Sequence, residues 1–132
     1  MTGETNLAVL LRSMKPVLNE GTYVFCTLDD REQIEEPDGI CSFREKEGLT
    51  VIIEKALADE RKFPYSFVAS WITLTVHSSL EAVGLTAAVS TALAAENISC
   101  NVVAAYYHDH IFVPVKDTAK AMEVLNTISA SR

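Results

Sequence analysis

The chain has 132 residues and a formal net charge of −7 at pH 7, because 11 Lys and Arg stand against 18 Asp and Glu. Its hydrophobic content of 48%, with five Gly and four Pro, describes a globular chain rather than a disordered one. Nucleic acids and anionic membrane surfaces are bound through clustered cations, so the acidic balance predicts neither as a partner.

The three cysteines are odd in number and have neither a CxxC pair nor zinc-finger spacing. We interpret Cys26, Cys41 and Cys100 as small hydrophobic side chains with free thiols. The first residues lack the basic region and apolar stretch of a secretory signal. No apolar run approaches the roughly 20 residues needed to cross a bilayer. We therefore expect a reduced, cytoplasmic protein.

The first half of the chain predicts a mixture of helix and strand. Apolar residues recur at helical spacing over residues 7–14, with Thr5 or Asn6 as N-cap, and Pro16 ends this helix. The elements predicted next are a strand at 23–28, an acidic solvated loop at 29–39, a hairpin of 40–44 and 49–53, and a short helix at 54–61.

The second half has clearer patterns. A long β-branched run predicts a strand at 66–77, and a helix beginning at Leu85 ends at Asn97 in the left-handed conformation, with Ile98 folding back on Leu93. A second hairpin of 99–107 and 110–115 follows. The last helix is capped by Asp117 and has an apolar face of Ala121, Val124, Leu125 and Ile128.

Both halves share the order strand, connection, hairpin, helix, which is a weak internal repeat. This order indicates an α+β, ferredoxin-like (βαββαβ) fold, with antiparallel sheets covered by helices. We expect two interlocked halves, 1–64 and 65–132, that share the strand 66–77. The second half has no strand after its final helix, and such an open edge invites another chain. We therefore expect a homodimer.

A resemblance to a known family is carried by the residues that open the helix at Leu85. The segment 80–93, closed by Asn97 and Ile98, resembles the ACT-domain signature, in which an Asp-x-Pro-Gly-Leu-like turn opens a helix. Glu81 stands near the acidic position, Val83 replaces the proline, and Gly84-Leu85 match the Gly-Leu.

A closer likeness is to small stand-alone bacterial ACT-like proteins of unknown activity. It rests on the blocks GETNL (3–7), YVFCT (23–27), FREKEGLT (43–50), WITLTVHSSLEAVGLT (71–86) and YHDHIFVPV (107–115). The resemblance implies a regulatory sensor of small metabolites, most often amino acids, whose ligand lies against the turn at 77–85.

Mapped onto this chain, the resemblance implies ligand-binding residues in and near that turn. The backbone around Val83, Gly84 and Leu85 would hold the ligand carboxylate, because a helix N-terminus favours anions and glycine allows close approach. The remaining candidates are Ser78, Ser79, Glu81 and Asn101. The two serines also fit N-capping of the helix, and Asn101 also fits a local Asx turn.

His77, His108, His110 and Arg44 are candidate contacts to a ligand or partner. His108 and His110 are two residues apart, so an extended chain aims both to one side and Asp109 to the other. Two imidazoles and a carboxylate can hold a divalent metal, whereas turn chemistry alone also explains Asp109. Arg44 could grip a carboxylate or simply lie at an exposed hairpin tip.

The sequence has no glycine-rich phosphate loop, no paired carboxylates and no Cys/His arrangement at catalytic spacing. We therefore expect a non-catalytic protein without a cofactor or bound metal, whose ligand is a small molecule such as an amino acid. Two alternatives stay open: a protein–protein interaction module that uses open strand edges, and a metal-responsive protein that uses the His108-Asp109-His110 turn.

Overall fold

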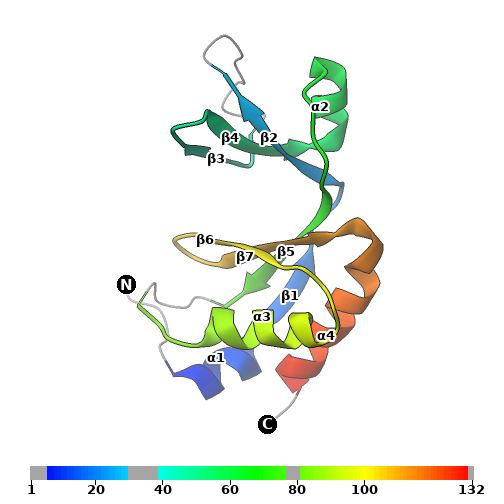
Figure 1. The fold of residues 1–132 in the computed structure, drawn as a ribbon. Coiled ribbons are helices and arrows are strands. Elements are labelled where there is room, and N and C mark those ends of the chain that lie inside the picture. Colours follow the sequence, from blue (N-terminus) through cyan, green and yellow to red (C-terminus); the bar gives the residue numbers. More distant parts are fainter. Residues whose placement is uncertain (1–5, 30–38, 77–80, 131–132) are drawn as a thin grey trace. The chain divides into compact units, whose positions relative to one another are not determined.

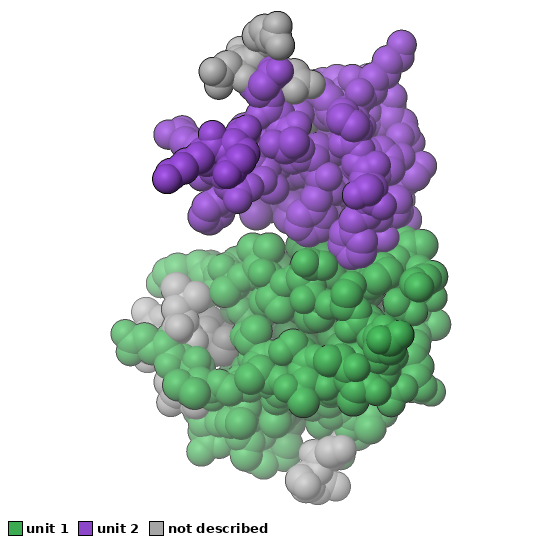
Figure 2. All heavy atoms as spheres, viewed as in Figure 1, with its two compact units in different colours: residues 1–19, 70–132 green, residues 20–69 purple. Residues whose placement is uncertain are grey.

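The computed structural model describes residues 6–29, 39–76 and 81–130 (Figure 1). The chain divides into two compact units, coloured separately in Figure 2. Unit 1 comprises residues 1–19 and 70–132, and unit 2 comprises residues 20–69. None of the helices in the described ranges is long and apolar enough to span a membrane.

Unit 2 is an antiparallel sheet with one helix. Its sheet has the order β3-β4-β2-β5, in which only Val68 and Ala69 at the start of β5 pair with β2. The elements are β2 (Tyr23–Leu28), β3 (Cys41–Arg44), β4 (Leu49–Glu54), α2 (Lys55–Arg61) and the beginning of β5 (Val68–Thr75). The core consists of Val24, Cys26, Leu28, Val51, Ile53, Ala58 and Phe63.

Unit 1 has a sheet of order β1-β5-β7-β6 and three helices that share one core with it. The elements besides β5 are α1 (Leu7–Ser13), β1 (Lys15–Leu18), α3 (Leu85–Ala95), β6 (Asn101–Ala104), β7 (Asp109–Pro114), a 3₁₀ turn (Val115–Asp117) and α4 (Thr118–Ala130). The core consists of Leu10, Met14, Ile72, Leu74, Leu85, Val89, Leu93, Ile98, Ile111, Val113, Ala121 and Leu125.

The strand β1 completes unit 1 from the other end of the chain. It pairs antiparallel with β5, from Lys15 opposite Thr75 to Leu18 opposite Ile72. In the ferredoxin-like order the fourth strand lies beside the first, and β1 takes that place. The prediction of an open edge after the last helix is therefore wrong, because the protein's own residues occupy that edge.

Pro16 explains why β1 is absent from the sequence prediction. We interpret it there only as the end of α1, yet it lies inside β1 opposite Leu74. Proline is tolerated on an edge strand, where a missing N–H costs no ladder bond. The expected halves 1–64 and 65–132 follow the order of the chain, whereas the compact units group residues 1–19 with 70–132.

Two of the predicted helix ends are confirmed by their hydrogen bonds, whereas the predicted cap Asp117 lies in the 3₁₀ turn before α4. The Asn6 side chain accepts from the Val9 N–H at 3.1 Å and caps α1. Asn97 has φ of 62°, and the Ile98 N–H donates to the Leu93 carbonyl at 3.0 Å, which closes α3. The predicted strands 66–77 and 99–107 are longer than the observed β5 and β6, and most of the acidic loop 29–39 lies outside the described residues.

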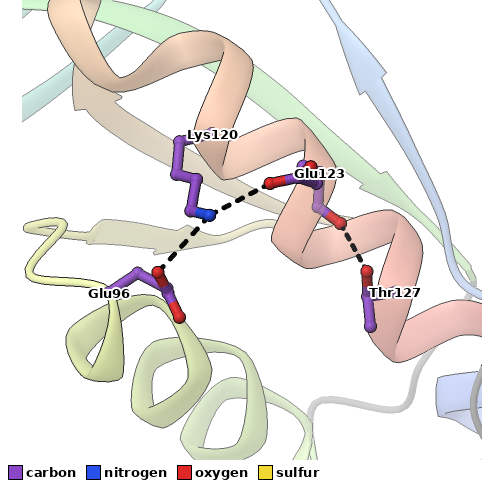
Figure 3. A network of polar contacts seen from close by, with 4 residues as sticks. All are labelled: Glu96, Lys120, Glu123 and Thr127. Atoms are coloured by element: carbon purple, nitrogen blue, oxygen red, sulfur yellow. Dashed lines mark hydrogen bonds and ion pairs between the residues drawn. The ribbon is translucent and has the colours of Figure 1, made fainter.

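A surface network joins α3 to α4 (Figure 3). Lys120 Nζ lies 3.5 Å from Glu96 Oε1 and 3.1 Å from Glu123 Oε1, and Thr127 Oγ1 donates to the Glu123 carbonyl at 2.9 Å. All three charged side chains are between 45% and 67% exposed. Exposed pairs of this kind add little to stability, so the apolar core carries the packing of α3 on α4.

Candidate functional site

The turn that opens α3 is built around Gly84. This residue is the N-cap of α3 and has φ of 106° and ψ of −22°, a left-handed conformation that glycine adopts without strain. A Cβ atom on Gly84 would lie 3.1 Å from Leu7 Cδ2 of α1. Because glycine offers no capping side chain, the first N–H groups of α3 are left for a backbone or ligand acceptor.

The predicted ligand-binding residues around Gly84 differ in exposure. Val83 is 82% exposed and Glu81 is exposed, whereas Leu85 is 3% exposed and packs in the core of unit 1. Leu85 can therefore offer a ligand only its backbone. Ser78, Ser79 and His77 lie outside the described residues.

The other candidates lie on strands. Asn101 is exposed at the start of β6, opposite Phe112 of β7. Arg44 is the last residue of β3 in unit 2 and is also exposed.

His110 is the centre of a polar cluster on the face of the unit 1 sheet that points away from the helices. Trp71 Nε1 donates to His110 Nδ1 at 3.0 Å, and Thr73 Oγ1 lies 3.1 Å from the same nitrogen. Asn19 Nδ2 lies 3.0 Å from Thr73 Oγ1 and 3.2 Å from the Trp71 carbonyl, to which it donates. Side chains therefore join β5 to β7 and to Asn19, the residue that follows β1.

Aromatic packing surrounds the same cluster. The rings of Trp71 and Phe112 stack with centroids 6.2 Å apart, and the Trp71 and His110 rings lie 5.7 Å apart at a tilt of 55°. Phe112 is 1% exposed and Thr73 is 8% exposed. Burial, together with the nearby His108, lowers the pKa of His110 below its ordinary value, against a smaller opposite effect of Asp109.

The turn residues His108 and Asp109 do not form a metal site with His110. Asp109 is the first residue of β7 and is 8% exposed, and burial raises the pKa of its carboxyl group. His108 Nδ1 lies 3.4 Å from the Val76 carbonyl. Within the described ranges no group of three or more His, Cys, Asp or Glu side chains could hold a metal ion.

Unit 2 carries a separate open hollow of about 590 Å³. Tyr65, on its wall, donates a 2.6 Å hydrogen bond to Asp59, which in turn lies 3.0 Å from Lys55 Nζ. None of the lining side chains carries a charge at neutral pH, so the hollow offers no ion pair to a zwitterion. The lining residues are Phe25, Cys26, Thr27, Thr50, Pro64, Tyr65 and Ser66.

Sequence reasoning finds His110 but misses its partners Trp71, Thr73 and Asn19. A signal for the first two exists in the alternation of β5, where they occupy the face opposite Ile72 and Leu74. Asn19 carries no such signal, because its role depends on the pairing of β1 with β5.

Comparison with known proteins identifies two ACT domains along the sequence, one over residues 2–70 and one over residues 66–127. A protein of unknown function from Vibrio cholerae, described as a possible transport protein, is 46% identical, with a TM-score of 0.80 over 93% of this chain and 95% of that chain. No functionally curated protein matches the chain.

Two more distant structures share the fold. A protein from Agrobacterium tumefaciens is 18% identical, with a TM-score of 0.70 over 88% of this chain and 89% of that chain. The ligand-free regulatory subunit of aspartate kinase from Thermus thermophilus is 8% identical, with a TM-score of 0.59 over 86% of this chain and 95% of that chain. The predicted α+β, ferredoxin-like fold and the predicted family are confirmed, and the chain belongs to the ACT-domain family.

Proposed function

We propose that the chain is a non-catalytic regulatory protein that binds a small metabolite, and that this metabolite is an amino acid. The observation that carries the proposal is the pair of ACT domains over residues 2–70 and 66–127. ACT domains are typically regulatory domains that bind small molecules, which supports that general role here. The amino acid is the finer part of the proposal.

The ligand carboxylate would lie at the first turn of α3. Gly84 supports this placement, because a glycine has no side chain that could stand between a ligand and the first N–H groups of α3, and its left-handed φ of 106° suits glycine. The ligand ammonium would lie near Glu81, and Ser78 and Ser79 are further proposed contacts. Asn101 lies opposite Phe112, on the face of the sheet that points away from α3, so it would not reach a ligand at this turn. Leu85 would contribute its backbone N–H, since its side chain is buried.

The test is a thermal-shift screen of the common amino acids on the wild type, followed by calorimetry with Val83→Asp and Val83→Asn. A ligand at 100 times its dissociation constant should stabilise the protein by about 2.7 kcal/mol. Val83 is 82% exposed, so neither variant should disturb folding. The aspartate should weaken binding roughly tenfold by repelling the carboxylate, whereas the asparagine should not.

Failure of every amino acid to shift the melting temperature would overturn the amino-acid proposal. Equal affinity of the Val83→Asp and Val83→Asn variants would instead show that the ligand carboxylate does not bind at the first turn of α3.

We also propose a homodimer. Val17 and Leu18 are 42% and 45% exposed on the edge strand β1, and exposed edge strands tend to meet other chains. Size-exclusion chromatography with light scattering tests this proposal, and a monomer at micromolar concentration would contradict it.

A further inference from the structure

The hydrogen bonds around His110 fix its protonation state. An indole N–H can only donate, so Nδ1, which faces Trp71 Nε1 at 3.0 Å, must be the unprotonated nitrogen of the ring. The ring proton then lies on Nε2. Thr73 completes the pattern, because its oxygen accepts from Asn19 while its own proton can point to Nδ1. The cluster is thus satisfied by a neutral imidazole in one tautomer.

A second proton on His110 would have to lie on Nδ1, where it would face the Trp71 N–H. The Thr73 hydroxyl can rotate and accept a hydrogen bond from the protonated Nδ1. The Trp71 indole N–H can only donate, so it cannot accept one. The indole must therefore move away from His110. Burial of the ring already disfavours the charged form, in the same direction as the geometry.

Asn19, the residue that follows β1, is hydrogen-bonded to both Trp71 and Thr73. The backbone N–H of Asn19 donates to the Trp71 carbonyl at 2.9 Å, and its side chain donates to the same carbonyl and approaches Thr73. Asn19 therefore depends on the two residues that hold the unprotonated Nδ1. We propose that His110 is a pH-sensitive latch on β1, in which protonation of the ring releases Asn19 and loosens β1 from β5.

Few charges face this latch. The neighbouring residues on the same face of β5 and β6, Thr75 and Val103, are uncharged, and β1 places Lys15 opposite Thr75 rather than opposite Thr73. In the turn and on β7, His108 opposes protonation of His110, and Asp109 favours it. The latch therefore responds to protonation of the His110 ring itself, and the charges of His108 and Asp109 adjust the pH at which it responds.

The test uses the whole chain and has two readouts. Nitrogen-15 NMR of the imidazole should show an unprotonated Nδ1 at pH 7.5. Hydrogen exchange of the Asn19 amide, corrected for its intrinsic pH dependence, should report an opening equilibrium that rises about tenfold per pH unit below about 6.5, until the native pKa is reached. Fluorescence of Trp71, the one tryptophan in the sequence, should change over the same range.

His110→Asn is the decisive variant, because its amide oxygen can still accept from Trp71 but does not titrate. We expect the acid opening to disappear in this variant and to persist in the matched control His108→Asn. A protonated Nδ1 at pH 7.5 would overturn the proposal, and this measurement needs only the wild type. The same acid opening in His110→Asn as in the wild type would also overturn it.

Discussion

The hydroxyl of Ser129, near the end of α4, donates a 2.6 Å hydrogen bond to the backbone carbonyl of Met14, 115 residues earlier in the chain. Met14 lies between α1 and β1, is 1% exposed and belongs to the core of unit 1. The N-terminal segment is therefore an integral part of the C-terminal ACT unit.

Truncation of a buried side chain in this segment should destabilise unit 1. Leu10 is fully buried, so Leu10→Ala should lower the free energy of unfolding by about 2–5 kcal/mol. Leu18→Ala is the matched control: Leu18 is 45% exposed on β1, and its loss should cost much less. Urea unfolding followed by Trp71 fluorescence measures both. A loss for Leu10→Ala as small as that for Leu18→Ala would contradict the packing of the N-terminal segment in the core of unit 1.

Gly84→Ala should destabilise the protein by about 1–2 kcal/mol, the usual cost of a left-handed conformation for a residue with a Cβ atom. The new methyl group would also lie close to Leu7. Gly39→Ala is the control, because among the described residues no atom outside its chain neighbours lies within 4 Å of its added Cβ. Thermal unfolding of both variants distinguishes them, and a neutral Gly84→Ala would show that the turn can relax.

Asp109→Asn should raise stability at neutral pH. Burial raises the pKa of Asp109 in the folded state, so the folded protein binds this proton more readily than the unfolded chain. The cost of the buried carboxylate is therefore present above that pKa and disappears as the pH falls through it. Denaturation from pH 7 to pH 4 should show a gain for the variant that shrinks in acid. A loss of stability at pH 7 would mean that the carboxylate is stabilised where it lies.

The three thiols should react at different rates. Burial raises the pKa of Cys100 to about 11, which leaves roughly one thiolate in a thousand at pH 8. Cys26 is 4% exposed, whereas Cys41 on the outer strand β3 is partly exposed. Alkylation with iodoacetamide at pH 8 and mass spectrometry should find Cys41 modified first, and all three modified in denaturant. Fast modification of Cys100 in the native protein would contradict its burial.

Local structure could be predicted because its causes are local. The cap at Asn6, the left-handed Asn97 and the hairpin before α2 each depend on residues within a few positions of one another. The partner of β1 could not be predicted, since periodicity does not say which strands pair. Pro16 is the strongest signal in that segment, and it predicted only the end of the first helix, not an edge strand.

The same limit applies to the candidate site. Gly84 follows from the family resemblance, because the Gly-Leu pair is contiguous in the sequence. The cluster around His110 does not follow, because Trp71 lies 39 positions away and Asn19 lies still further. Only the adjacency of β1, β5 and β7 brings these side chains together.

The pairing of β1 with β5 in unit 1 also dictates an order of assembly during synthesis. Unit 2 is continuous over residues 20–69, so all of its partners have been made before β7 or α4 emerges. In unit 1, by contrast, α1 and β1 are made first but cannot complete their packing until α4 has been synthesised. Contacts between residues this far apart in the sequence form slowly. The residues of α1 and β1, although made before the rest of unit 1, are thus the last to reach their native packing.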